Sequence, residues 1–214
     1  MSFVRDPHSG CPLLHAGRPL ADARIAMIMV HGRGATAESI LELASEFPGS
    51  EVAYLAPQAA GNTWYPQSFL AEIPRNEPWL SSALAALRDV LVRVGSAGIP
   101  PERTILLGFS QGACLSLELA ARSAKRYGGV VGLSGGLIGP PGTAREYPGN
   151  LAGTPVFLGC SDRDPHIPLG RVKETGDVLG RLGGAVEMRI YPNFGHSVNE
   201  DELGWVRGLL SAFE

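Results

Sequence analysis

The chain has 214 residues, a formal net charge of −3, 44% hydrophobic residues and 18% charged residues. This length suits one well-buried domain, and the composition is that of a globular protein with a substantial apolar core rather than a disordered chain. The slightly acidic balance offers no general attraction for polyanions, so we expect no nucleic-acid partner. We therefore expect a single domain over residues 1–214.

Short aliphatic runs alternate along the chain with longer helical patterns, which indicates βα units around a parallel sheet. Several runs are almost continuously apolar, as expected of strands that helices cover on both faces. The predicted strands are 24–30, 51–56, 104–108, 129–134, 155–160 and 186–191, and the predicted helices are 36–47, 78–95, 111–126, 169–182 and 200–213. This order predicts an α/β protein with a central, mostly parallel sheet.

Two predicted connections, 57–77 and 135–154, are long for a compact domain, where loops above about 12 to 15 residues are commonly functional. The first carries Trp64, Tyr65 and Phe69. Disordered loops rarely hold so many apolar side chains. We interpret these three residues as candidate lining of a substrate pocket, with ordinary loop packing as the alternative.

The strand at 104–108 runs directly into G-F-S-Q-G at 108–112, and a helical pattern follows. A G-x-S-x-G motif between a strand and a helix places its serine on a strained turn that exposes the hydroxyl. Glycines are needed on both sides because strand and helix pass too closely there for a Cβ. This context predicts Ser110 as a nucleophile, whereas the nearby Cys114 is interpreted as a core residue.

A serine hydroxyl becomes a good nucleophile when an imidazole takes its proton and a carboxylate orients that imidazole. His166 and His196 are the histidines that follow Ser110 in the chain. His196 lies in the loop after the last predicted strand, where sites of parallel sheets gather, and we predict it as the base. The acid is expected after the strand at 155–160, where spacing does not separate Asp162 from Asp164. The early histidines, His8 and His15, are interpreted as surface residues.

Two backbone N–H groups should stabilise the oxyanion that forms on attack. One is expected from Gln111, directly after the nucleophile, and the other from the loop after the strand at 24–30. That loop reads H-G-R-G at 31–34, and its glycines would let the Arg33 amide point inwards. We predict Arg33 and Gln111 as the donors, with an ordinary Gly-rich turn as the alternative for Arg33. His31 is expected to brace the loop by hydrogen bonding.

With these residues placed, the chain resembles the phospholipase/carboxylesterase family of α/β-hydrolases. The resemblance rests on H-G-R-G at 31–34, G-F-S-Q-G at 108–112, L-S-G at 133–135, D-P-H-I-P at 164–168 and G-H-S at 195–197. It implies the α/β-hydrolase fold. In that family the aspartate directly before proline is the acid, which implies Asp164.

Two departures concern the substrate. Family members that act on acylated proteins or lysolipids usually carry H-G-L-G-D, whereas this chain places the charged Arg33 at the site mouth. Where those members often show W-F-D, this chain has W-Y-P at 64–66. The sequence therefore looks closer to bacterial carboxylesterase-like members.

The cysteines Cys11, Cys114 and Cys160 form no C-x-x-C pair, so the sequence indicates neither a zinc site nor a disulfide framework. Residues 1–10 hold no apolar core of signal-peptide length, and no apolar run approaches the roughly 18 residues of a membrane helix. We therefore expect a cytoplasmic protein without stable membrane insertion.

Taken together, these features predict a serine hydrolase that cleaves carboxylic esters or thioesters through a Ser110–Asp164–His196 triad and an acyl-enzyme. Such chemistry needs no metal or cofactor, and its partner is a small-molecule ester or thioester. The alternatives are a lysophospholipase or acyl-protein thioesterase, and a non-catalytic binding module on the same fold. A dienelactone hydrolase shares the fold but uses a cysteine where this chain has Ser110. The sequence leaves a homodimer open.

Overall fold

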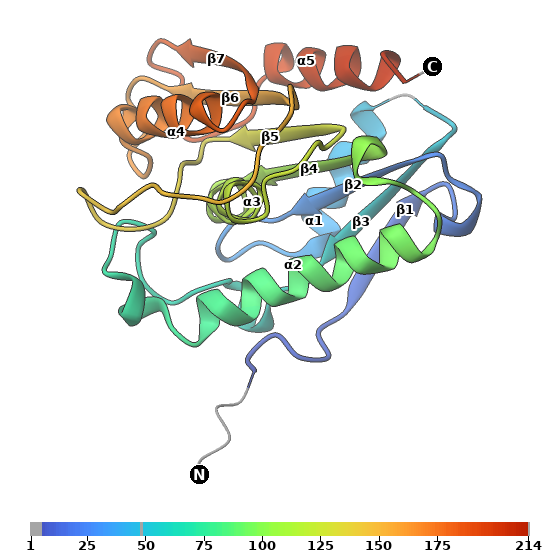
Figure 1. Cartoon of the computed structure of the whole chain (residues 1–214), viewed down its shortest axis with the longest axis horizontal. Helices are drawn as coiled ribbons and strands as arrows, with labels where there is room; N and C mark the ends of the chain where they lie inside the picture. Colours follow the sequence, from blue (N-terminus) through green and yellow to red (C-terminus); the bar gives the residue numbers. More distant parts are fainter. Residues whose placement is uncertain (1–5, 48, 214) are drawn as a thin grey trace.

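The structure is a computed structural model that describes residues 6–47 and 49–213, so residues 1–5, 48 and 214 of the predicted domain lie outside it. Its strands form one sheet of seven, in the order β1-β3-β2-β4-β5-β6-β7 (Figure 1). Strand β1 pairs antiparallel with β3, and all other pairs are parallel. The strands are β1 (Leu13–Gly17), β2 (Ile25–Val30), β3 (Val52–Pro57), β4 (Thr104–Phe109), β5 (Gly129–Leu133), β6 (Pro155–Ser161) and β7 (Ala185–Tyr191).

In the described part of the chain, five α-helices cover both faces of the sheet; the first four connect strands, and the fifth follows β7. They are α1 (Ala37–Leu41), α2 (Trp79–Ser96), α3 (Gln111–Arg122), α4 (Leu169–Arg181) and α5 (Glu200–Ser211). The predicted helix at 36–47 continues after α1 as a 3₁₀ helix, Glu42–Glu46, and α3 ends four residues before the predicted boundary. The predicted α/β class and six predicted strands are confirmed, and β1 was not predicted.

The core consists of two apolar layers, one on each side of the sheet. Helices α2, α3 and α4 lie on one side, while α1 and α5 lie on the other (Figure 1). Strand β2 illustrates the arrangement, because its even-numbered side chains pack into the first layer and its odd-numbered ones into the second. Every residue of β2 is buried, which explains its unbroken apolar sequence.

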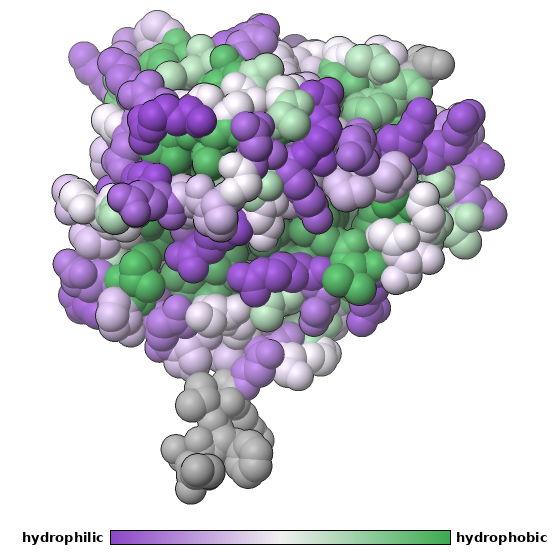
Figure 2. Space-filling model, in the orientation of Figure 1, coloured by the Kyte–Doolittle hydropathy of each residue, from purple (hydrophilic) through white to green (hydrophobic). Residues whose placement is uncertain are grey.

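The molecular surface in Figure 2 mixes hydrophilic side chains with smaller hydrophobic areas. Large hydrophobic side chains with substantial exposure include Val92, Met188 and Phe194, which lie on different elements. Within residues 6–47 and 49–213, no helix has the length and apolar character needed to cross a membrane.

Several loops with polar residues leave the sheet at the carboxyl ends of its parallel strands. The loops after β2, β4, β6 and β7 begin at residues 31, 110, 162 and 192, and they all leave the sheet at the same edge. In parallel α/β sheets this edge is where ligands bind. The topology thus brings together side chains that are distant in sequence.

Candidate active site

Ser110 lies on a strained turn between β4 and α3. Its φ is 56° and its ψ is −120°, a conformation that is rare for residues with a side chain. A Cβ on Gly108 would collide with the backbone of Gly112, and a Cβ on Gly112 would collide with the carbonyl of Val30. These two glycines therefore allow strand and helix to pass closely enough to hold the Ser110 turn.

Ser110, His196 and Asp164 form a continuous hydrogen-bonded chain. The Ser110 Oγ lies 2.8 Å from His196 Nε2, and His196 Nδ1 lies 2.7 Å from Asp164 Oδ2. We assign the proton of the neutral imidazole to Nδ1, which donates to the carboxylate, so that Nε2 accepts from the hydroxyl. The structure thus brings the predicted nucleophile, base and acid together.

The carboxylate of Asp164 is completely buried, whereas the His196 side chain is 17% exposed. Burial by itself would raise the pKa of Asp164. The hydrogen bonds from His196 and from the amides of His166 and Ile167 outweigh that effect and hold this pKa below its ordinary value. The side chain therefore stays ionised and can stabilise an imidazolium.

Asp162, the competing candidate acid, lies elsewhere in the same loop. Its exposed side chain accepts a hydrogen bond from Asn193 N at 2.7 Å, and no hydrogen bond joins it to His196. Asn193 belongs to the loop that carries His196. Asp162 therefore supports that loop rather than contacting the imidazole.

Ser161, the last residue of β6, also supports the His196 loop and was not singled out from the sequence. Its buried Oγ accepts hydrogen bonds from Phe194 N and Gly195 N, both at 3.1 Å. A serine at the end of a strand carries no sequence signal for such a role, because the amides that it binds are more than thirty residues away.

The loop at 31–34 lies beside Ser110, and His31 braces it as expected. His31 Nε2 accepts from Ala59 N at 3.1 Å, so Nδ1 carries the proton and donates to Gly32 O at 2.8 Å. Burial lowers the pKa of His31, which agrees with a neutral ring. Among the described residues, neither the Arg33 N–H nor the Gln111 N–H has a hydrogen-bond acceptor. Both remain available to a ligand.

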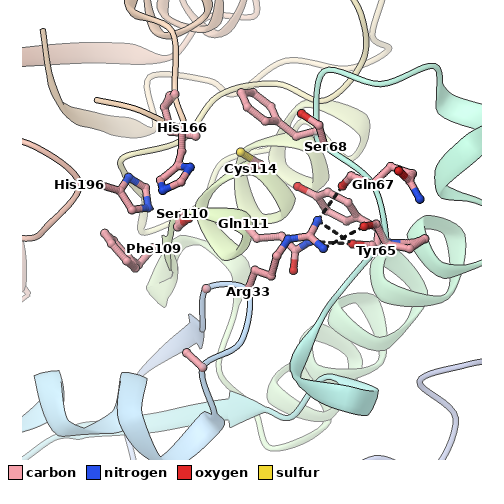
Figure 3. A pocket seen from close by; sticks show the side chains of 15 residues that line it. Arg33, Tyr65, Gln67, Ser68, Phe109, Ser110, Gln111, Cys114, His166 and His196 are labelled. Carbon is pink, nitrogen blue, oxygen red and sulfur yellow. Dashed lines mark hydrogen bonds between the residues drawn. The ribbon is translucent and has the colours of Figure 1, made fainter. Parts of the chain in front are cut away.

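A cavity of about 510 Å³ opens over Ser110 (Figure 3). Tyr65 and Phe69 line it, together with Arg33, His166 and His196.

Trp64 does not line this cavity, so its predicted pocket role is wrong. Its indole is fully buried behind the wall, where Nε1 donates to His31 O at 2.9 Å. Trp64 therefore anchors the loop instead of facing a substrate.

The cavity wall also contains Cys114, one helical turn after Ser110. Burial raises the pKa of this thiol to about 12, so it carries no thiolate near neutral pH. Tyr65 lies beside it (Figure 3), and burial raises the pKa of Tyr65 well above its ordinary range. Among the side chains of this wall, Ser110 is therefore the candidate nucleophile. Cys114 is a buried core residue, as expected from the sequence.

His166, the less favoured candidate base, lies in the cavity against His196. The two rings meet edge to face, with their centroids 4.8 Å apart (Figure 3). His196, and not His166, bonds the Ser110 hydroxyl, while the backbone amide of His166 bonds Asp164. The sequence did not indicate that His166 would line the cavity.

The sheet and the serine on a strained strand-to-helix turn define an α/β-hydrolase. A model of the phospholipase/carboxylesterase family matches residues 18–213. The crystal structure of a phospholipase/carboxylesterase from Dyadobacter fermentans superposes with a TM-score of 0.91 and 40% identity, covering 94% of this chain and 97% of that one. The chain therefore belongs to the phospholipase/carboxylesterase family, whose members are serine hydrolases.

Curated relatives agree with this assignment. Acyl-protein thioesterase 1 from Gibberella zeae is 36% identical over 116 residues, which are 53% of this chain and 49% of that protein. The carboxylesterase SOBER1 from Arabidopsis thaliana is 23% identical over 205 residues, which are 88% of this chain and 90% of that protein. The chain spans about half the length of the acyl-protein thioesterases that it matches.

Proposed function

We propose that this chain hydrolyses carboxylic esters, and thioesters of similar shape, with Ser110 as nucleophile, His196 as general base and Asp164 as the orienting acid. The observation that carries the proposal is the hydrogen-bonded chain from Asp164 through His196 to Ser110, which ends at the cavity. The family membership supports the same reaction class.

In the acylation step, the Ser110 Oγ forms a bond to the carbonyl carbon while its proton passes to His196 Nε2. The carbonyl oxygen becomes an oxyanion, which the N–H groups of Arg33 and Gln111 stabilise. Asp164 stabilises the imidazolium without taking its proton. His196 then gives the proton to the leaving alcohol or thiol as the C–O or C–S bond breaks, which leaves an acyl-enzyme.

In the deacylation step, water replaces the leaving group. His196 Nε2 takes a proton from that water, and the hydroxide attacks the acyl carbon through a second oxyanion. The bond to Ser110 Oγ breaks, and the imidazolium returns the proton to the serine. The carboxylic acid product leaves, and the chain regains its starting protonation state without a cofactor.

The cavity supports a substrate of small to medium size. Its volume of about 510 Å³ lies in the range of pockets that hold one small organic molecule. Tyr65 and Phe69 supply apolar wall on one side of Ser110, and we propose them as contacts of an acyl or aryl group. A lysophospholipase or protein deacylase would instead need space for a long acyl chain.

Labelling with a fluorophosphonate probe tests the proposal directly. We expect the probe to modify Ser110, and we expect Ser110→Ala to abolish both labelling and hydrolysis of p-nitrophenyl acetate. A folded wild-type chain that neither reacts with the probe nor cleaves esters would favour a non-catalytic binding module. A series of esters and thioesters of graded acyl length should show highest kcat/KM for short chains. A maximum at long chains would favour the lysophospholipase or deacylase alternative.

A further inference from the structure

The side chains of Arg33 and Gln111 converge on one peptide carbonyl. Arg33 follows β2 and Gln111 follows β4, so their positions relative to each other are not fixed by a common loop. Arg33 Nη2 donates to Tyr65 O at 3.0 Å, and Gln111 Nε2 donates to the same oxygen at 2.8 Å (Figure 3). One oxygen atom of the 63–67 segment thus links the two residues whose amides are the proposed oxyanion donors.

Arg33 holds this segment through two further carbonyls. Its Nη1 donates to Pro66 O at 2.9 Å, and its Nη2 donates to Gln67 O at 2.6 Å. The planar guanidinium can serve several acceptors at fixed angles, which the single ammonium of lysine cannot reproduce. No carboxylate among the described residues forms an ion pair with Arg33. The positive charge of Arg33 therefore lies against the backbone carbonyls of residues 65–67.

Gln111 holds the segment from the other side. Its Oε1 accepts from Trp64 N at 2.9 Å and from Thr63 Oγ1 at 3.3 Å, in addition to the bond from Nε2 to the Tyr65 carbonyl. The Gln111 side chain is buried, so water does not compete for these bonds. The amide group therefore fits this segment as both donor and acceptor.

Hydrogen bonds also tie the 63–67 segment, and Asn62 directly before it, to the loop at 31–34. Trp64 Nε1 donates to His31 O at 2.9 Å, and Gly34 N donates to Asn62 O at 2.7 Å. Trp64 and Tyr65 are almost completely buried, which fixes the segment against the core. Without the Gln111 side chain, the buried Tyr65 carbonyl would lose a donor that water does not replace.

We propose that the 63–67 segment is a brace that sets the spacing of the two oxyanion donors, and that the Arg33 and Gln111 side chains are positioning groups acting through it. The proposal rests on the function proposed above. An error of about 1 Å in the placement of a catalytic group can cost roughly 100-fold in rate. Loss of the brace should therefore weaken binding of the tetrahedral species much more than binding of the substrate.

The test uses Arg33→Met and Gln111→Met, which remove the side-chain hydrogen bonds but keep the backbone amides; methionine matches glutamine in length and replaces the stem of arginine. We expect kcat for p-nitrophenyl acetate to fall by about 10- to 100-fold in each, with KM changed by less than about 3-fold. Affinity for phenylboronic acid, which forms a tetrahedral adduct with the Ser110 Oγ, should fall by a similar factor. Arg33→Lys should recover only part of the loss.

Arg126→Met is the matched control, because Arg126 also donates to a backbone carbonyl, that of Ala152, but does not line the cavity. It should keep the wild-type kcat and boronate affinity. In the double variant Arg33→Met/Gln111→Met, the loss should be smaller than the product of the single losses, since both act through Tyr65.

Wild-type kcat and boronate affinity in both single variants would overturn the brace. A loss of ester turnover without loss of boronate affinity would also overturn it. If one variant does not fold, the other decides, because each releases the same segment from a different side. An inactive wild-type chain that resists the fluorophosphonate probe would instead overturn the proposed function, so the two failures are distinguishable.

Discussion

His196 Nε2 lies 2.8 Å from Ser110 Oγ, although the two residues are 86 positions apart in the chain. The parallel sheet makes this contact possible, because β4 and β7 end at the same edge and each is followed directly by one of the two loops. The two residues therefore meet only in the folded protein, and their reactivity depends on each other.

Replacing His196 by Ala should remove the reactivity of Ser110. The hydroxyl would lose its proton acceptor, and kcat should fall by about four to six orders of magnitude. His166→Ala is the control, since His166 lines the same cavity but does not contact the Ser110 hydroxyl, and its kcat should stay within about 10-fold. Rates of fluorophosphonate labelling measure both effects. Full-rate labelling of His196→Ala would contradict the assignment of the base.

The two aspartates of the 162–164 loop should respond differently to amide substitution. Asp164→Asn removes the negative charge beside His196 and should lower kcat by about 10⁴-fold, because the imidazole loses both its orientation and its stabilised charge. Asp162→Asn keeps an oxygen that can accept from Asn193, so its kcat should change little. Steady-state hydrolysis of p-nitrophenyl acetate separates the two. A larger loss in Asp162→Asn would reverse the assignment.

The strands that sequence analysis found are those with strong physical signals. Strands β2, β3 and β5 are buried on both faces, and such strands must be continuously apolar. Strand β1 was missed because it is a short antiparallel edge strand in which exposed positions, such as His15, interrupt the apolar pattern. An edge strand needs only one packed face, and Leu13–Gly17 gives a correspondingly weak signal.

The site was predictable where the backbone imposes a residue type. Ser110 requires glycines on both sides, which makes its turn visible in the sequence. The brace was not predictable, because Arg33 and Gln111 bind backbone carbonyls, and any residue supplies a carbonyl. The same holds for His8, which was expected at the surface but is buried, with Nδ1 accepting from Ala60 N and Nε2 bonded to Trp64 O.

Replacing Tyr65 by Phe should leave the stability unchanged or raise it. The Tyr65 hydroxyl is buried beside the Cys114 thiol, which is a weak partner, and it forms no hydrogen bond of good geometry among the described residues, so its desolvation is poorly compensated. We expect the free energy of unfolding to rise by up to about 1 kcal/mol. Tyr127→Phe is the matched control, because the Tyr127 hydroxyl donates to Ser123 O at 3.0 Å. That variant should lose about 1 kcal/mol in urea denaturation. A greater loss for Tyr65→Phe than for Tyr127→Phe would contradict this account.

Glu202 should make the stability depend on pH near neutrality. Its carboxyl group is buried at the start of α5, where Oε2 accepts from Asn199 N at 2.9 Å. Burial raises the pKa of Glu202 to about 7, although the bond from Asn199 opposes the shift. The ordinary value of 4.5 applies to the unfolded chain. Between pH 4.5 and about 7, Glu202 is protonated in the folded chain but ionised in the unfolded chain. This contribution to stability is therefore fully present below pH 4.5 and is lost as the pH rises through about 7.

Glu202→Gln stays neutral and should remove this dependence, while its amide oxygen can still accept from Asn199. The stability of the variant relative to the unchanged chain should therefore increase from pH 5 to pH 8, by at most about 1.4 kcal/mol per pH unit. Thermal unfolding at several pH values measures the difference. Glu102→Gln, at an exposed carboxylate that forms no ion pair within residues 6–47 and 49–213, is the control and should change the slope less than Glu202→Gln does. A constant difference between Glu202→Gln and the unchanged chain across this range would show that Glu202 does not take up a proton on folding.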